Sequence, residues 1–108
     1  MATGQKTNVG FNGTKTIRET TVITRLEDFF GKQISDLNEP ISDFVGGNAG
    51  AVRALADALN RYDGFHDDGL ELAPGDLQGV TTIGMIVVAI LMWYGQNGWN
   101  VIHRPMGG

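Results

Sequence analysis

Apolar side chains recur at helical spacing in the first half of the chain. The pattern runs from Thr20 to Leu37, with apolar residues at steps of three and four and polar residues between them. This period is typical of an amphipathic helix, so the sequence predicts a helix over residues 20–37. We expect its apolar face, here called the interaction stripe, to pack on a second helix or on an identical subunit. The interaction stripe consists of Ile23, Leu26, Phe30, Ile34 and Leu37.

A second amphipathic helix is predicted from Ala49 to Tyr62. Apolar residues, many of them small, again recur at steps of three and four, and Asp63-Gly64 ends the pattern. Pro40 separates the two helices, because proline cannot continue a helix without the loss of a backbone hydrogen bond. Residues 20–62 are therefore expected to form a small helical domain.

Two polar segments flank this domain. Residues 1–19 are rich in Thr, Gly and Asn and show no hydrophobic period. They predict a disordered or extended N-terminal arm. Residues 63–76 combine carboxylates with glycines and a proline, and this composition predicts an acidic loop.

The last apolar segment, residues 77–102, contains no Asp, Glu, Lys or Arg. Its densest part, Gly79 to Gly95, would span roughly 26 Å as a helix, close to the hydrocarbon core of a bilayer. Trp93, Tyr94 and Trp99 gather at one end, as amphipathic rings do at a membrane interface. The pattern predicts one transmembrane helix over residues 77–102 and a short tail at 103–108.

The alternative is that residues 77–102 are buried in protein. Their β-branched residues suit strands, and a helix inside a soluble oligomer would hide the same surface. We prefer the transmembrane interpretation because the rest of the chain offers little apolar surface to cover this segment. The expected fold class is therefore mainly α, with an N-terminal arm, two short amphipathic helices and one C-terminal transmembrane helix.

Charge and composition exclude several kinds of function. The chain has a net charge of -4 and a pI of about 4.9, and its basic residues are spread singly. Without a basic surface to neutralise phosphates, nucleic acid is not an expected partner. The chain has no cysteine, which excludes thiol catalysis, disulfides and cysteine-ligated metals.

The acidic loop carries the only candidate metal ligands that we consider. Carboxylate oxygens suit Ca²⁺, but the spacing of these residues does not match the calcium-binding loop of an EF-hand. We therefore predict a solvated loop, with no metal, no cofactor and no catalytic site. The candidate ligands are Asp63, Asp67, Asp68 and Glu71.

These features together predict a non-enzymatic, single-pass membrane protein with a structural or assembly role. The leading hypothesis is a component of a membrane-containing bacterial virus that links lipid to the protein shell. Its partners would be the bilayer and other subunits of a large assembly, including copies of itself. It would lie in the internal membrane of the virion or in the bacterial inner membrane. The alternatives are an accessory subunit of a cellular membrane complex, a holin-type lysis protein, and a soluble oligomer subunit with residues 77–102 buried.

Overall fold

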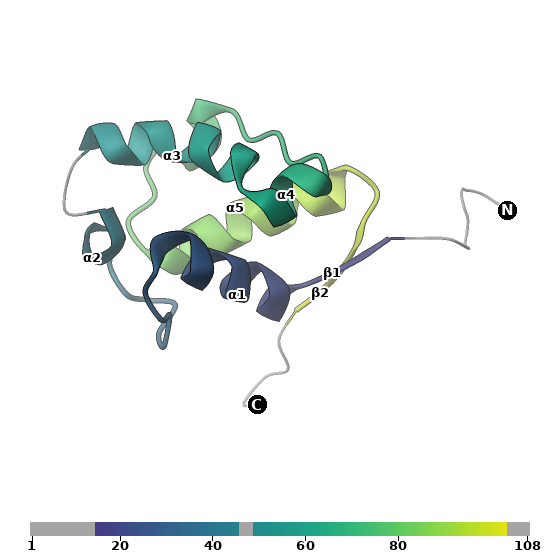
Figure 1. The fold of residues 1–108 in the computed structure, drawn as a ribbon, viewed down its shortest axis with the longest axis horizontal. Helices are drawn as coiled ribbons and strands as arrows, with labels where there is room; N and C mark the ends of the chain where they lie inside the picture. The colour runs from purple at the N-terminus through teal and green to yellow at the C-terminus, as the bar shows by residue number, and fades with distance from the viewer. Residues whose placement is uncertain (1–14, 46–48, 104–108) are drawn as a thin grey trace, which may run out of the picture.

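The computed structural model describes residues 15–45 and 49–103, with the backbone alone at residues 49–53. This part of the chain is mainly helical, as the sequence predicts (Figure 1). Helix α5 runs lengthwise through the molecule, with α1 on one side and α3 and α4 on the other. In chain order the elements are β1 (Thr16–Arg18), α1 (Glu19–Phe30), α2 (Ser42–Val45), α3 (Ala49–Arg61), α4 (Asp63–Asp67), the 3-10 helix η1 (Pro74–Leu77), α5 (Ile83–Gln96) and β2 (Asn100–Ile102).

Helix α1 is shorter than the predicted helix over residues 20–37. It ends at Gly31, whose φ of 66° lies in the left-handed region that favours glycine. The N–H groups of Gly31 and Lys32 both donate to the Glu27 carbonyl. The predicted continuation to Leu37 is therefore wrong, although the chain beyond Gly31 returns to the hydrophobic core.

The loop after α1 caps the first turn of α5. The N–H of Ile83 donates to the Glu39 carbonyl at 3.0 Å, and the N–H of Gly84 donates to the Leu37 carbonyl at 2.8 Å. These are donors that a helix N-terminus leaves without a partner inside the helix. The approach requires glycine at position 84, because a Cβ there would lie 2.7 Å from the Leu37 carbonyl oxygen.

Helix α3 matches the predicted second helix to within one residue at its C-terminal end. The acidic loop that follows is partly helical, since α4 and η1 both lie within residues 63–77. Asn60 fixes the extended segment between them: its amide donates to the Leu72 carbonyl at 2.9 Å and accepts from the Leu72 N–H at 2.8 Å. This pairing holds Leu72 against the core, where Leu70 and Leu72 are both buried.

The predicted transmembrane helix over residues 77–102 is wrong. Among the residues that the structure describes, no helix is both long and apolar enough to cross a membrane. The segment turns at Gly79, whose φ is 81°, then forms α5, and turns again at Gly98, whose φ is 86°. Helix α5 has 14 residues. That is a length of about 21 Å, short of a hydrocarbon core of about 30 Å.

The N-terminal arm predicted for residues 1–19 also needs a correction at its C-terminal end. Strand β1 pairs in parallel with β2, with Ile17 opposite Val101, and the Ile17 side chain is buried. An apolar residue in an otherwise polar segment is thus held by a strand more than 80 residues later in the chain. Residues 1–14 of the predicted arm and 104–108 of the predicted tail lie outside the described residues.

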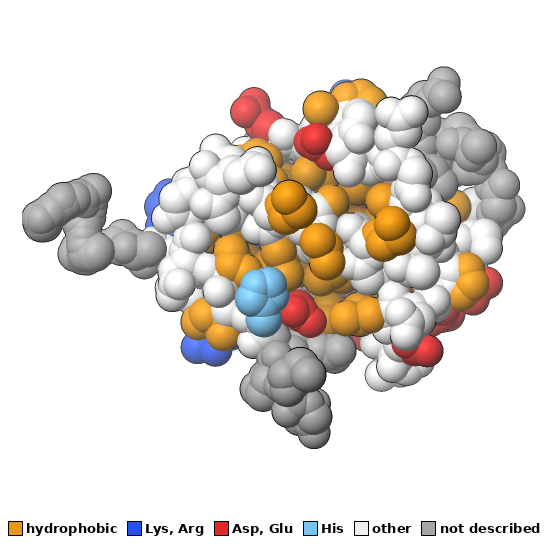
Figure 2. All heavy atoms as spheres, turned by 180° about the vertical axis from the view of Figure 1, so that it is seen from behind, with side chains coloured by type: hydrophobic (Ala, Val, Ile, Leu, Met, Phe, Trp, Pro, Cys, Tyr) orange, Lys and Arg blue, Asp and Glu red, His pale blue; other side chains and the backbone are white. Residues whose placement is uncertain are grey.

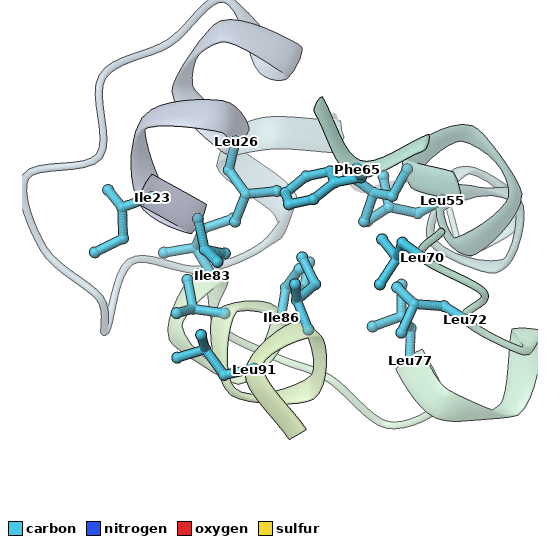
Figure 3. Packing of buried hydrophobic residues seen from close by; sticks show 14 of the residues in the cluster. Ile23, Leu26, Leu55, Phe65, Leu70, Leu72, Leu77, Ile83, Ile86 and Leu91 are labelled. Carbon is cyan, nitrogen blue, oxygen red and sulfur yellow. The ribbon is translucent and has the colours of Figure 1, made fainter. Parts of the chain in front are cut away.

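The hydrophobic core forms around α5. Figure 3 shows Leu26 of α1, Leu55 of α3 and Phe65 of α4 gathered about Ile83 and Ile86 of α5. Several short elements therefore supply the apolar surface that covers this helix, including leucines of the predicted acidic loop. The buried residues of α5 recur at steps of three and four, namely Ile83, Ile86, Val87, Ile90, Leu91 and Tyr94.

Candidate interaction surface

The carboxylates proposed as metal ligands do not converge in the structure. Asp63 and Asp67 are exposed on α4, and Glu71 is exposed in the segment that follows. Asp68 points instead toward Arg25 and Tyr94. Across residues 15–45 and 49–103, no group of three or more His, Asp or Glu side chains is placed to hold a metal ion.

Asp68 belongs to a hydrogen-bonded network that joins α1, α4 and α5. Its Oδ2 accepts from Arg25 Nη1 at 2.9 Å and from the Tyr94 hydroxyl at 2.7 Å, while Arg25 Nη1 also lies 3.2 Å from that hydroxyl. The Arg25 guanidinium stacks over the Phe65 ring, with its carbon 5.3 Å from the ring centre. Gly64 leaves room for Arg25, because a Cβ at Gly64 would lie 2.7 Å from Arg25 Nε.

The network keeps Tyr94 protonated and Arg25 charged. Burial raises the pKa of the Tyr94 hydroxyl well above its usual value, and the hydrogen bond to Asp68 raises it further. Burial alone would lower the pKa of Arg25, but the hydrogen bond and charge of Asp68 and the neighbouring Tyr94 reverse this, so the net shift is upward. Both pKa shifts favour the protonated forms of Tyr94 and Arg25, which are the forms that donate hydrogen bonds to Asp68. The network therefore stabilises the contact between the helices.

The aromatic residues predicted to lie at a membrane interface instead pack on one another. The Tyr94 ring contacts Trp93 and Trp99 edge-on, with ring centres 5.1 Å and 4.8 Å apart. Tyr94 is fully buried, and the two tryptophans are half-buried against the core. The predicted interfacial belt is therefore wrong, because its central ring lies inside the protein.

The interaction stripe also lies within the molecule. Ile23, Leu26 and Ile34 are buried, and Phe30 and Leu37 are half-buried against the core. The stripe is divided between α1 and the loop after it, and the α1 portion packs on α5. Its apolar surface is thus used in folding the chain, and little of it remains for another subunit.

The outward side of α5 is apolar and uncovered. Met85, Val88 and Met92 are 44%, 55% and 58% exposed, and they follow one another at steps of three and four. They are the exposed large hydrophobic residues of the part of the chain that the structure describes. Seen from behind, the molecule shows hydrophobic side chains gathered near the centre of this face (Figure 2). We call Met85, Val88, Ala89 and Met92 the α5 outer face.

An open groove of about 540 Å³ runs along this face. Leu37, Val80 and Gly84 continue its apolar lining, whereas Asn38, Gln78 and Thr82 border it with uncharged polar groups. Asp76 is the one charged residue that lines the groove. Met85 is held in place by Thr81, whose N–H and hydroxyl lie 3.4 Å and 3.3 Å from the Met85 sulfur. The groove is therefore a shallow apolar surface with a polar border.

The α5 outer face could not be predicted from the sequence, because the helix is apolar on both sides. Periodicity shows which face of a helix is buried only when the opposite face is polar. The available signal was the contrast between β-branched residues at the buried positions and methionines at two of the exposed ones. Met side chains are flexible and adapt to varied contacts, which is why they recur on binding surfaces.

A second cleft, of about 450 Å³, lies where β1 meets α1. It is polar, and its lining includes Arg18, Thr21, Arg25 and Asp68. Arg25 is already engaged by Asp68 and Tyr94, so this cleft offers a single further cation, Arg18.

The α5 outer face is thus the surface of the described residues that most needs a partner. A contiguous exposed apolar patch with a polar border is typical of a protein–protein or membrane contact. Comparison with protein-family models, with curated proteins and with solved structures finds no match to this chain.

Proposed function

We propose that this protein is a non-enzymatic assembly protein that binds another protein through the α5 outer face. The observation that carries the proposal is the exposure of Met85, Val88 and Met92 on one side of the helix that forms the core. Exposed apolar residues are ordinary when scattered singly, but a contiguous stripe along one helix is not.

The geometry suits recognition by a helix. Residues at steps of three and four form a ridge, and ridges pack into the grooves of a facing helix at 8–10 Å between axes. The groove beside the ridge is open and apolar, so a facing helix can lie along it. The rigid core beneath α5 presents the surface without a large ordering cost, since the inward residues of the helix are almost completely buried.

A protein fits this face better than an anionic lipid surface does. Helices that lie on membranes usually carry Lys and Arg beside their apolar face. The residues that line the groove include no Lys or Arg, and the one charge among them is the carboxylate of Asp76. A negative border repels anionic headgroups and is compatible with a protein partner.

The virus, accessory-subunit and lysis hypotheses relied on a membrane span over residues 77–102. The assembly role does not depend on that span, because the apolar surface that it requires is present on α5. The proposal therefore keeps the structural role and assigns its contact to protein. That the assembly is a virus particle stays a prediction.

Site-specific photo-crosslinking in the producing cells tests the proposal. A photoreactive residue placed at Val88 should give discrete protein adducts, and Met92→Glu in the same chain should abolish them. The matched control is a photoreactive residue at Ala58, an exposed position on α3. Equal adducts at both positions, or adducts to lipid alone at Val88, would contradict the proposal.

A further inference from the structure

Both methionines that the structure describes lie on the α5 outer face. Met85 and Met92 are 44% and 58% exposed, and Val88 lies between them on the same side of the helix. The hydrophobic core of the described residues is built from aliphatic and aromatic side chains and contains no methionine. The thioether sulfurs of this part of the chain are therefore concentrated on the surface proposed for docking.

A thioether on a protein surface is a target for hydroperoxides. The chain has no cysteine, whose thiolate would compete for the oxidant. A sulfur lone pair attacks one peroxide oxygen and the O–O bond breaks, so the sulfur gains that oxygen and loses two electrons. The other oxygen leaves with the proton of the first, as water from hydrogen peroxide or as an alcohol from an organic peroxide. The product is methionine sulfoxide, a polar side chain with a strong hydrogen-bond acceptor.

We propose that Met85 and Met92 are an oxidation site for hydroperoxides, and that their conversion to sulfoxides releases the protein partner from the α5 outer face. The inference rests on the proposed function, because it names a modification that controls the same surface. The sulfoxide oxygens would lie beside Val88, Leu37 and Val80, which offer no side-chain donor. A docked partner would bury these oxygens without hydrogen bonds, and burial of an unpaired polar group opposes binding.

The two methionines differ in their surroundings. The Met85 sulfur lies 3.4 Å from the Thr81 backbone nitrogen and 3.3 Å from the Thr81 hydroxyl oxygen. Both groups donate to the sulfur lone pairs, so they reduce its reactivity toward a peroxide, and they are placed to bond a sulfoxide oxygen once the flexible side chain moves. Among the described residues, no donor contacts the Met92 sulfur. Met92 is therefore the more reactive residue and the one whose oxidation harms docking more.

Treatment of the purified full chain with hydrogen peroxide, followed by peptide mass spectrometry, tests the chemistry. Met92 should gain its oxygen at least about twice as fast as Met85, and Thr81→Val should narrow the difference, since it removes one donor from the Met85 sulfur. Equal rates in the wild type would contradict the role assigned to Thr81.

Thermal unfolding of the oxidised chain separates an effect on the surface from an effect on the fold. The Tm should fall by no more than about 3 °C, because neither sulfur lies in the core. A larger fall would mean that oxidation acts by unfolding the chain and would overturn the inference.

Photo-crosslinking tests the consequence for docking. The purified chain with a photoreactive residue at Val88 is oxidised, freed of peroxide, mixed with an extract of the producing cells and irradiated. Oxidation should lower the yield of protein adducts at least about fivefold. Reduction of the oxidised chain by methionine sulfoxide reductases and a thiol should restore that yield.

The matched control is the double variant Met85→Leu Met92→Leu, which keeps the other two methionines of the chain. Its adduct yield after peroxide should equal its own yield before peroxide, because the α5 outer face then carries no sulfur. An equal loss in this variant, or wild-type adducts that persist after complete oxidation of Met85 and Met92, would overturn the inference. Persistent adducts would leave the proposed function standing, whereas an untreated chain that gives no adducts would remove both.

Discussion

The inward and outward sides of α5 are both apolar, but only the inward side is buried in the hydrophobic core. Ile86 and Ile90 on the inward side are fully buried, whereas Val88, between them in the chain, is 55% exposed. A single hydropathy profile describes both sides. The difference is set by the neighbouring elements, because α1 and the leucines near α3 cover one side of the helix and the described elements leave the other open.

This contrast shows how the sequence of a helix in a folded domain can resemble that of a transmembrane helix. A helix needs an apolar inner side for the core, and a second apolar side only if another surface covers it. When both are present, the residues read as uniformly hydrophobic. The fold alone therefore does not explain why the outer face of α5 is apolar.

Ile90→Ala should have the largest effect on the free energy of unfolding. A small effect would contradict the difference between the two sides of α5. Truncation of a fully buried isoleucine should lower the free energy of unfolding by about 2–5 kcal/mol, because it removes packing and leaves a cavity. Val88→Ala, two positions away, should change it by less than about 0.5 kcal/mol in dilute protein. Urea unfolding at a few micromolar gives both values. Similar losses for the two variants would mean that the sides of α5 are not distinct.

Gly84→Ala should follow in size. The added Cβ would meet the Leu37 carbonyl oxygen at 2.7 Å, so the loop that caps α5 must move and the hydrogen bond from the Gly84 N–H must lengthen. We expect a loss of about 1–3 kcal/mol in unfolding free energy. Gly75→Ala is the matched control, because a Cβ at Gly75 meets nothing within 4 Å. Equal effects of the two substitutions would contradict the packing of the loop on α5.

Tyr94→Phe should cost about 1–2 kcal/mol at neutral pH, since Asp68 loses a donor and Arg25 loses a neighbour. It should also change how the free energy of unfolding depends on pH in the alkaline range. The folded-state pKa of Tyr94 is raised, chiefly by burial. Its contribution is therefore complete below the unfolded value of about 10 and is lost as the pH rises above it.

Urea unfolding between pH 8 and pH 11 checks this sign. The wild type should lose stability above pH 10 more steeply than Tyr94→Phe. Tyr62→Phe serves as the comparison, because the pKa of half-buried Tyr62 is raised first by its hydrogen bond to Asp28 and only second by burial. If Tyr94→Phe and the wild type lost stability equally above pH 10, the Tyr94 hydroxyl of the wild type would have to lie in solvent.

Met92→Glu should have the smallest effect on the fold. The side chain is 58% exposed, so a charge there should change the free energy of unfolding by no more than about 0.5 kcal/mol in dilute protein. Thermal unfolding at a few micromolar measures this. A large loss would show that the outer face supports the fold and would remove the basis for treating it as a docking surface.

The helices of the chain could be predicted from the sequence where one face is polar. The second helix was predicted almost to its last residue, because small apolar positions alternate there with Asp57, Asn60 and Arg61. The end of α1 was harder to predict, since Ile34 and Leu37 continue the apolar period after the chain has left the helix. Gly31 is the stop signal that the sequence offers, because glycine favours the left-handed conformation in which many helices end.

The long-range contacts could not be predicted. Strand β1 is only three residues long and pairs with a strand near the other end of the chain, so no local pattern indicates it. The network of Arg25, Asp68 and Tyr94 joins three separate elements, and Asp68 looked like any other carboxylate of an acidic loop. Leu70 and Leu72 alternate with polar residues in that loop, and this alternation was the available sign that the segment packs on the core.

The most direct test of the account is methyl NMR of the methionines on the α5 outer face, Met85 and Met92. Their methyl signals, assigned with Met85→Leu and Met92→Leu, should change together when an extract of the producing cells is added to the labelled chain, because a protein partner covers this face. The same extract should leave the Met85 signal of Met92→Glu unchanged. Signals of Met85 and Met92 that do not respond to the extract, or a Met92→Glu spectrum that changes as much as that of the wild type, would contradict docking of a protein on this face.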